Sequence, residues 1–261
     1  MIKIQMRMNS LTLYRPVVLS VALPYSLSSG IDLKKVLYLL HPAMENGDFF
    51  FDKLGLLDKV DRHGVVIVAP DLGNGYFINT PYEKQADFLQ MELMPVMNEM
   101  LRLSSRREDN MLLGISMGAF GAAQWALSCT ERFNKVALIS GVFDASLPVD
   151  ERARKNRAQR PLVKLFSEKI MPLLMQNGRG DISPEADIRF LYAKAAEKGA
   201  PCFALWHGDE DYLSINQSEN FVSQCKRHGI NAERHISAGA HNLQYWQDTM
   251  GEVFDWLMMK N

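Results

Sequence analysis

The fold of this chain is decided by the stretch Met111-Leu112-Leu113-Gly114-Ile115-Ser116-Met117-Gly118-Ala119-Phe120-Gly121-Ala122. A short apolar run leads to Ser116, which has a glycine two positions to either side, and a helix-compatible pattern of small residues follows. This pattern predicts a strand, a sharp turn and a helix, with the serine in strained backbone geometry and its hydroxyl exposed. The N–H of Met117 would then point toward negative charge forming beside that hydroxyl. Chance occurrence of these residues in a loop is the alternative interpretation, and the flanking strand and helix favour a catalytic serine.

Length and composition exclude several classes of protein. The 261 residues can build a large core, and the apolar and charged fractions are those of an ordinary globular protein. A net charge of −1 argues against a nucleic-acid partner, which would require a basic excess. No apolar run approaches the ~20 residues of a membrane-spanning helix, and the alternating start of the chain is unlike a secretory signal.

Apolar segments of two periodicities alternate along the chain. Ile2 to Met8 and Thr12 to Leu23 predict an antiparallel hairpin with its turn at Asn9-Ser10. Later apolar runs predict strands at Lys34–Leu40, Val65–Ala69, Met111–Ile115, Val136–Ser140, Cys202–Trp206 and Arg234–Ile236. Helical spacing predicts helices at Leu54–Val60, Gln85–Leu103 with a kink at Pro95, Asp187–Lys198, Ile215–His228 and Leu243–Met259.

This order predicts the fold class. It is α/β, with a mostly parallel central sheet and helices on both faces, in a single domain over residues 1–261. A helical, cap-like insertion after the sixth strand is expected around residues 144–183. Its segment Glu151 to Arg160 carries five arginines and lysines against one acid, and a solvated helix face explains this better than an anion site.

A serine nucleophile needs an imidazole to remove its proton, and that imidazole needs a carboxylate to orient it. His241 fits the first role, because it lies in a small-residue loop between the last strand and the last helix; helix capping is the alternative. The acids Asp209, Glu210 and Asp211 follow the strand at Cys202–Trp206. Asp211 is predicted as the partner because it lies beyond the turn, and Asp209 is expected to cap the turn or the following helix. Three acids without a further ligand cluster predict no metal site.

The loop after Lys34–Leu40 is expected to supply a second donor to an oxyanion beside Met117. We predict the backbone N–H of Ala43, since Pro42 has none. Asn46, Tyr76, Trp206 and Tyr212 lie in loops or at a strand end near the expected site. They are candidates for substrate binding, with ordinary packing as the alternative.

Several of these motifs together resemble a known family. Leu37-Tyr38-Leu39-Leu40-His41, Gly114 to Ala122, Gly208 to Leu213, and Gly239-Ala240-His241 followed by Trp246 are similar to the esterase D and tributyrin-esterase-like group of α/β-hydrolases. That group includes S-formylglutathione hydrolases, acetyl-xylan and feruloyl esterases, and mycolyltransferases. The resemblance implies an α/β-hydrolase fold, Ser116 as nucleophile, Asp211 as orienting acid, His241 as base, and Met117 and Ala43 as oxyanion donors.

The chain also departs from that group. His41-Pro42 stands where the group usually has His-Gly, Asn242 stands where an acid is frequent, and residues 144–183 match no segment of it. The expected activity is a serine carboxylesterase for small, short-chain acyl esters, without metal or organic cofactor. Alternatives are a thioesterase of the S-formylglutathione hydrolase type, an acyltransferase, and an inactive binding protein that kept the fold.

Partners and location follow from the same composition. The expected partner is a small-molecule ester, with no nucleic acid and no membrane. Fifteen methionines and the loop aromatics agree with a homo-oligomer and equally with core filling. The cysteines Cys129, Cys202 and Cys225 are too few and too scattered for a disulfide framework, which predicts reduced thiols and a cytoplasmic location.

Overall fold

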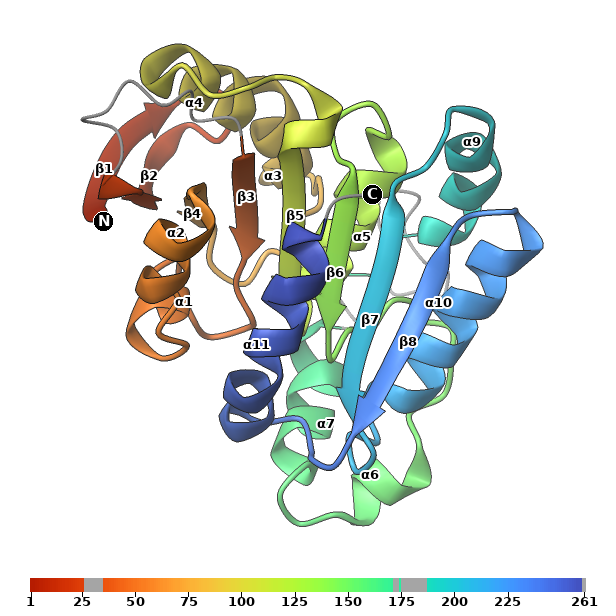
Figure 1. Cartoon of the computed structure of the whole chain (residues 1–261). Helices are drawn as coiled ribbons and strands as arrows, with labels where there is room; N and C mark the ends of the chain where they lie inside the picture. The colour runs from red at the N-terminus through yellow and green to blue at the C-terminus, as the bar shows by residue number, and fades with distance from the viewer. Residues whose placement is uncertain (26–34, 171–173, 175–186, 260–261) are drawn as a thin grey trace.

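In the computed structural model, which describes residues 1–25, 35–170, 174 and 187–259, eight strands form one sheet in the order β1-β2-β4-β3-β5-β6-β7-β8 (Figure 1). β1 and β2 pair antiparallel, β2 joins β4 antiparallel, and all pairs from β4 to β8 are parallel. The strands are β1 Ile2–Ser10, β2 Arg15–Leu23, β3 Lys35–Leu40, β4 Val65–Asp71, β5 Asn110–Ile115, β6 Lys135–Ile139, β7 Cys202–Gly208 and β8 Ala232–Ser237.

The central strands are largely apolar because both faces of the sheet are covered. In β3, Val36, Tyr38 and Leu40 belong to one hydrophobic cluster, whereas Leu37 and Leu39 belong to the other. Period-two alternation therefore directs neighbouring side chains of one strand into two cores.

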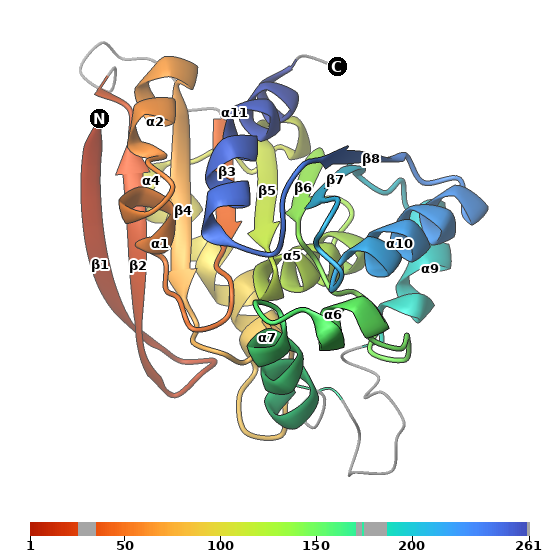
Figure 2. The ribbon, with the colours of Figure 1, turned by 90° about the horizontal axis from the view of Figure 1, so that it is seen from below.

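Helices cover the two faces unequally. The described helical segments are α1 Phe49–Asp52, α2 Leu57–His63, α3 Gln85–Asp87, η2 Phe88–Leu93, α4 Met94–Leu101, η3 Arg107–Asp109, α5 Met117–Ser128, α6 Glu151–Lys155, α7 Arg160–Leu165, η4 Phe166–Ile170, η5 Ile188–Phe190, α9 Leu191–Glu197, α10 Ile215–Arg227 and α11 Leu243–Met258. α1, α2 and α11 pack on one face, and α4, α5, α9 and α10 on the other (Figures 1 and 2).

The first hairpin and the helix before the serine turn differ from the prediction in ways that have a physical reason. The hairpin turn occupies residues 11–14, two residues beyond the expected Asn9-Ser10, because β1 continues to Ser10. The helix expected over Gln85–Leu103 is interrupted by the π-helical segment η2, which ends just before Pro95. A proline removes one backbone donor and crowds the preceding turn, and a wider helical turn accommodates it.

The helices α6, α7 and η4 follow the sixth strand, as the sequence predicts. They lie beside the carboxyl ends of β7 and β8 (Figure 1). The rest of the cap-like insertion expected around residues 144–183 falls on 171–173 and 175–183, which lie outside the described residues.

Substitution of two helix glycines, one in open space and one against a strand end, tests how closely α5 approaches β3. A Cβ at Gly251, in α11, would meet nothing within 4 Å, whereas a Cβ at Gly118 would overlap the carbonyl oxygen of Leu40. We therefore expect Gly251→Ala to raise the free energy of unfolding by about 0.5–1 kcal/mol, through the lower backbone entropy of the unfolded chain. Gly118→Ala should lower it. Urea denaturation measures both, and an unchanged midpoint for Gly118→Ala would contradict the tight approach.

Candidate active site

The turn between β5 and α5 holds Ser116 in an unusual backbone conformation, with φ 54° and ψ −113°. Its N–H donates to the carbonyl of Ile139 in the neighbouring strand at 2.8 Å. A side chain at Gly114 would overlap the backbone of Gly118, and one at Gly118 would overlap the carbonyl of Leu40. The two glycines therefore allow the strand, the helix and the end of β3 to converge on the serine.

Ser116, His241 and Asp211 meet although they are far apart in sequence. Ser116 Oγ lies 2.9 Å from His241 Nε2, and His241 Nδ1 lies 3.1 and 3.2 Å from the two carboxylate oxygens of Asp211. An ionised carboxylate only accepts hydrogen bonds, so Nδ1 carries the proton and Nε2 accepts from the serine hydroxyl. This arrangement can withdraw the hydroxyl proton as the oxygen attacks a carbonyl carbon.

Asp211 is fully buried, with 0% of its surface exposed. Burial raises the pKa of this carboxyl group, but the charge and hydrogen bond of His241 and hydrogen bonds from Ser214 and Ser140 lower it. The net effect holds the pKa of Asp211 below its ordinary value. The carboxylate is therefore ionised at neutral pH, as a partner for an imidazolium requires.

Asp209 has a different role from the one that the sequence predicts. It does not cap its own turn: its carboxylate accepts the N–H of Gly239 at 3.0 Å, in the loop that carries His241. The N–H of Glu210 also donates to the carbonyl of Gly239, at 2.8 Å. The loops after β7 and β8 are thus tied together, which holds Asp211 and His241 at a fixed separation.

Two backbone N–H groups stand near the serine turn without a hydrogen-bond partner in the described part of the chain. Met117 is the first residue of α5, where an N–H has no partner within the helix. Ala43 lies in the loop after β3, whose approach to α5 is set by the contact of Leu40 with Gly118. Its neighbour Met44 differs, since the N–H of Met44 donates to Asn74 at 2.7 Å.

His41 stabilises the loop after β3 through two hydrogen bonds of its ring. Its ring is buried; Nδ1 donates to the carbonyl of Pro42 at 2.9 Å, and Nε2 accepts the N–H of Leu72 at 3.4 Å. Burial lowers the pKa of His41, so the ring is neutral at neutral pH and can accept at Nε2. His41 thus links the loops that follow β3 and β4.

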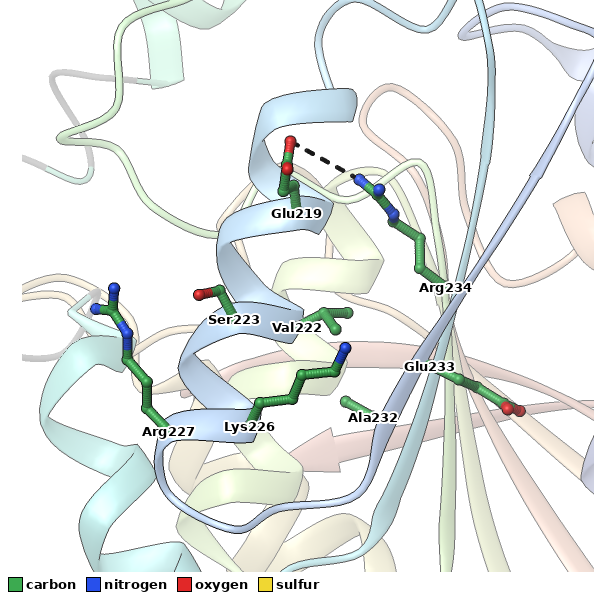
Figure 3. Close-up of a pocket in the computed structure, with 8 residues that line it drawn as sticks. All are labelled: Glu219, Val222, Ser223, Lys226, Arg227, Ala232, Glu233 and Arg234. Atoms are coloured by element: carbon green, nitrogen blue, oxygen red, sulfur yellow. Dashed lines mark ion pairs between the residues drawn. The ribbon is translucent and has the colours of Figure 1, made fainter.

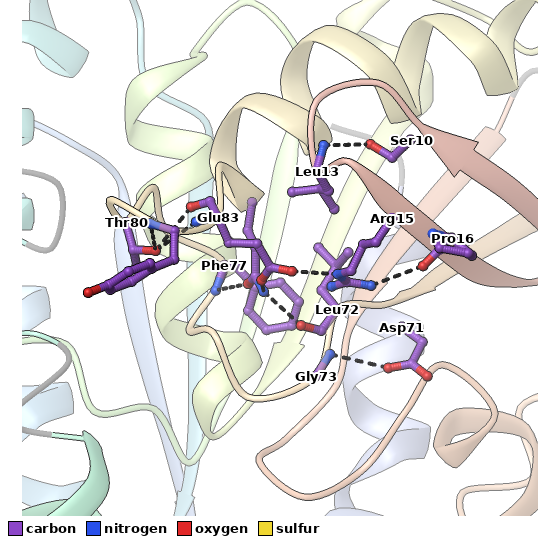
Figure 4. A network of polar contacts seen from close by, with 12 residues as sticks. Ser10, Leu13, Arg15, Pro16, Asp71, Leu72, Gly73, Phe77, Thr80 and Glu83 are labelled. Carbon is purple, nitrogen blue, oxygen red and sulfur yellow. Dashed lines mark hydrogen bonds and ion pairs between the residues drawn. The ribbon is translucent and has the colours of Figure 1, made fainter.

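A buried amide holds the loop after β4. Gln85 accepts the N–H of Phe77 at 3.0 Å and donates to the carbonyl of Leu72 at 2.7 Å and to Glu83 at 2.6 Å. Glu83 in turn pairs with Arg15 of β2 (Figure 4). The sequence carries no signal for this network, because these partners join only in the folded chain.

The four candidate substrate-binding residues separate into two groups. Tyr76 and Trp206, with 4% and 0% of their surface exposed, are core residues: Tyr76 packs on Phe120, and Trp206 packs between His235 and Trp256. β7 runs two residues further than expected, which puts Trp206 inside the strand and corrects its placement at the strand end.

The other two candidates lie nearer the surface. Asn46 is exposed and its side-chain oxygen accepts the N–H of Asp48, so it stabilises a turn. Tyr212 is half-buried, directly after Asp211, with the guanidinium of Arg152 4.7 Å above its ring. Gln159, at the start of α7, donates to the carbonyl of Glu210 at 2.5 Å. The insertion therefore contacts the loop that carries the acid.

A separate hollow of about 750 Å³ lies between α10 and β8 (Figure 3). No residue of the Ser116–His241–Asp211 group lines it. Its lining carries charges of both signs, including an ion pair between Glu219 and Arg234. Within the described ranges, no group of three or more His, Cys, Asp or Glu side chains could hold a metal ion, and no helix is long and apolar enough to cross a membrane.

A family model described as putative esterase matches residues 72–257, which is more than half of the chain. The chain belongs to this esterase family. An acetyl esterase of Caldicellulosiruptor saccharolyticus is 23% identical over 234 residues, which cover 85% of this chain and 83% of that protein. The Mycobacterium tuberculosis esterase Rv1288 is 29% identical over 113 residues, which cover 41% of this chain and only 25% of that protein.

Solved structures show the same fold. The fluorophosphonate-binding serine hydrolase FphF of Staphylococcus aureus has a TM-score of 0.81 at 20% identity, with 99% of each chain covered. The S-formylglutathione hydrolase FrmB of Staphylococcus aureus has a TM-score of 0.78 at 20% identity, also with 99% of each chain covered. The esterase has the α/β-hydrolase fold that the sequence predicts, and as a member of the esterase family it is a hydrolase.

The network around Gln85 can be tested by an isosteric change. Gln85→Met keeps the length of the side chain but leaves the N–H of Phe77 and the carbonyl of Leu72 without this partner. Unpaired buried polar groups are costly, so we expect the free energy of unfolding to fall by about 2 kcal/mol. Gln244→Met, at an exposed position of α11, is the matched control and should change it by less than about 0.5 kcal/mol. Equal effects in urea denaturation would contradict the role of Gln85.

Proposed function

We propose that this esterase is a serine carboxylesterase that hydrolyses small esters with short acyl groups through an acyl-enzyme. The observation that carries the proposal is the 2.9 Å contact between Ser116 Oγ and His241 Nε2, with Asp211 on the other ring nitrogen. The acetyl esterase that matches 85% of the chain supports the short acyl group.

The reaction has two halves. Ser116 Oγ attacks the ester carbonyl carbon as its proton passes to His241 Nε2, and the N–H groups of Met117 and Ala43 donate to the oxyanion. The tetrahedral intermediate collapses, the bond to the leaving alcohol breaks, and His241 returns the proton to that alcohol. Water then attacks the acyl-enzyme by the same route, which releases the carboxylic acid and restores the Ser116 hydroxyl. Asp211 stabilises the imidazolium in both halves.

We also infer that residues 1–261 form one domain, since a single sheet runs through the described ranges. The three cysteines are free, and burial raises the pKa of Cys129 to about 11 and that of Cys225 to about 12, so these thiols are protonated. Free thiols fit a reducing compartment, and we place the enzyme in the cytoplasm.

Hydrolysis of p-nitrophenyl acetate tests the roles of the three residues. We expect Ser116→Ala and His241→Ala each to lower kcat/KM by about 10³-fold or more, because the first removes the nucleophile and the second removes the base that activates it. Asp211→Asn should cost about 10²–10⁴-fold, since it removes the negative charge beside the imidazolium.

Asp209→Asn is the matched control for Asp211→Asn. An asparagine oxygen can still accept the N–H of Gly239, so we expect kcat/KM to stay within about tenfold of the wild type. Circular dichroism would establish that each variant is folded. A larger loss for Asp209→Asn than for Asp211→Asn would overturn the assignment of the acid.

A panel of substrates tests the substrate class. We expect kcat/KM to fall as the acyl group of p-nitrophenyl esters grows from acetyl to octanoyl, and to be higher for phenyl acetate than for an S-acetyl thioester of glutathione. The similarity to the S-formylglutathione hydrolase FrmB gives thioester hydrolysis as the alternative. Preference for the thioester would favour that alternative and leave the serine mechanism intact.

A further inference from the structure

Ser140 adjoins Asp211 of the proposed triad and has strained backbone geometry. It follows β6 and has a φ of 53°, in the left-handed region that non-glycine residues rarely adopt. Its N–H donates to the carbonyl of Trp206 at 2.8 Å, and 0% of its surface is exposed. A buried, strained serine at the carboxyl edge of a sheet points to a role for its hydroxyl.

That hydroxyl accepts one hydrogen bond from a tryptophan. Trp246 Nε1, in the first turn of α11, donates to Ser140 Oγ at 3.0 Å. The same indole packs edge-on against the His241 ring, with 5.5 Å between the ring centroids and 78° between the ring planes. Trp246 therefore contacts the imidazole directly and reaches the region of Asp211 through Ser140.

The direction of the hydrogen bonds follows from the chemistry of the groups. An indole N–H only donates, so Ser140 Oγ accepts from it and its own proton is free to point to another acceptor. The Ser140 hydroxyl is one of the groups that lower the pKa of Asp211 through a hydrogen bond, so we assign the Asp211 carboxylate as that acceptor. Asp211 thus accepts from Ser140 on one side and from His241 Nδ1 on the other, and hydrogen bonds connect Trp246 with Ser116 through these three residues.

We propose that Ser140 and Trp246 are positioning residues, which together fix the orientation of Asp211 and His241 and limit how strongly the carboxylate attracts a protonated imidazole. The inference rests on the proposed serine mechanism, because it concerns the orientation of two residues of that mechanism and the attraction between them.

The sign of the effect on the pH profile follows from charge. A hydrogen bond from Ser140 disperses negative charge on Asp211, so its removal strengthens the attraction between the carboxylate and an imidazolium at His241. The acid limb of the pH profile, over which kcat/KM rises with pH, should then move to higher pH. Two other titratable groups interact with Asp211: burial lowers the pKa of His207 and raises that of Tyr245, which keeps both uncharged near neutral pH. Asp209, on the same loop as Asp211, faces the His241 loop and accepts the N–H of Gly239.

Two substitutions separate the hydrogen bonds from packing. Trp246→Phe keeps a ring beside His241 but removes the N–H, and Ser140→Gly suits the left-handed backbone while it removes the hydroxyl. We expect each to lower kcat for p-nitrophenyl acetate roughly 10-fold with little change in KM, and to move the acid limb upward. The double variant should lose no more than Ser140→Gly alone, because the N–H acts through the hydroxyl.

Trp125→Phe is the matched control. Trp125 is also buried, and its Nε1 has no hydrogen-bond partner among the residues that the structure describes. The rate and pH profile of this variant should equal those of the wild type. Additive losses in the double variant, or a fall in rate with an unmoved acid limb, would overturn the positioning role.

A readout independent of catalysis separates this inference from the proposed function. The proton on His241 Nδ1 should give a downfield proton NMR signal that is absent in His241→Ala. We expect this signal to shift in Trp246→Phe and its titration to move to higher pH. An unchanged signal in an active enzyme would refute the inference alone; a shifted signal in a protein without esterase activity would refute the proposed function alone.

Discussion

The proposed active site depends on one local strain, the positive φ of Ser116. Such a conformation costs about 1–3 kcal/mol and persists only where the surroundings fix it. Here the fixing elements are the hydrogen bond to the carbonyl of Ile139 and the close contacts at Gly114 and Gly118, which exclude any side chain. In such a turn the Ser116 hydroxyl lies beyond the end of the strand, and the N–H of Met117 points to the region beside that hydroxyl.

The second requirement is a buried negative charge. Asp211 has no contact with solvent, and an isolated carboxylate there would be strongly destabilising. Its hydrogen bonds with His241, with the N–H of Ser214 and with Ser140 offset that cost. The hydrogen bond between Asp209 and Gly239 joins the loops after β7 and β8, and it thereby keeps the Asp211 carboxylate within hydrogen-bond distance of His241.

The sequence predicts most of this arrangement because the chemistry is local. Glycine spacing identifies the serine turn, apolar runs identify the parallel strands, and the loops after them contain the acid and the histidine. The rest depends on contacts that no sequence pattern marks. Gln85 gives no local sign of its three partners, and Trp206 looks like a strand-end residue until β7 is seen to continue to Gly208. The π-helical segment before Pro95 and the hairpin turn at residues 11–14 are set by packing and register, which periodicity does not specify.

The central claim is that Ser116 is the one hydroxyl made reactive by this fold. Reaction of the purified protein with a fluorophosphonate, followed by peptide mass spectrometry, tests it most directly. The account predicts a single adduct on the peptide that contains Ser116, formed far more slowly in the His241→Ala variant. No adduct at all, or an adduct on another residue that persists in Ser116→Ala, would contradict it.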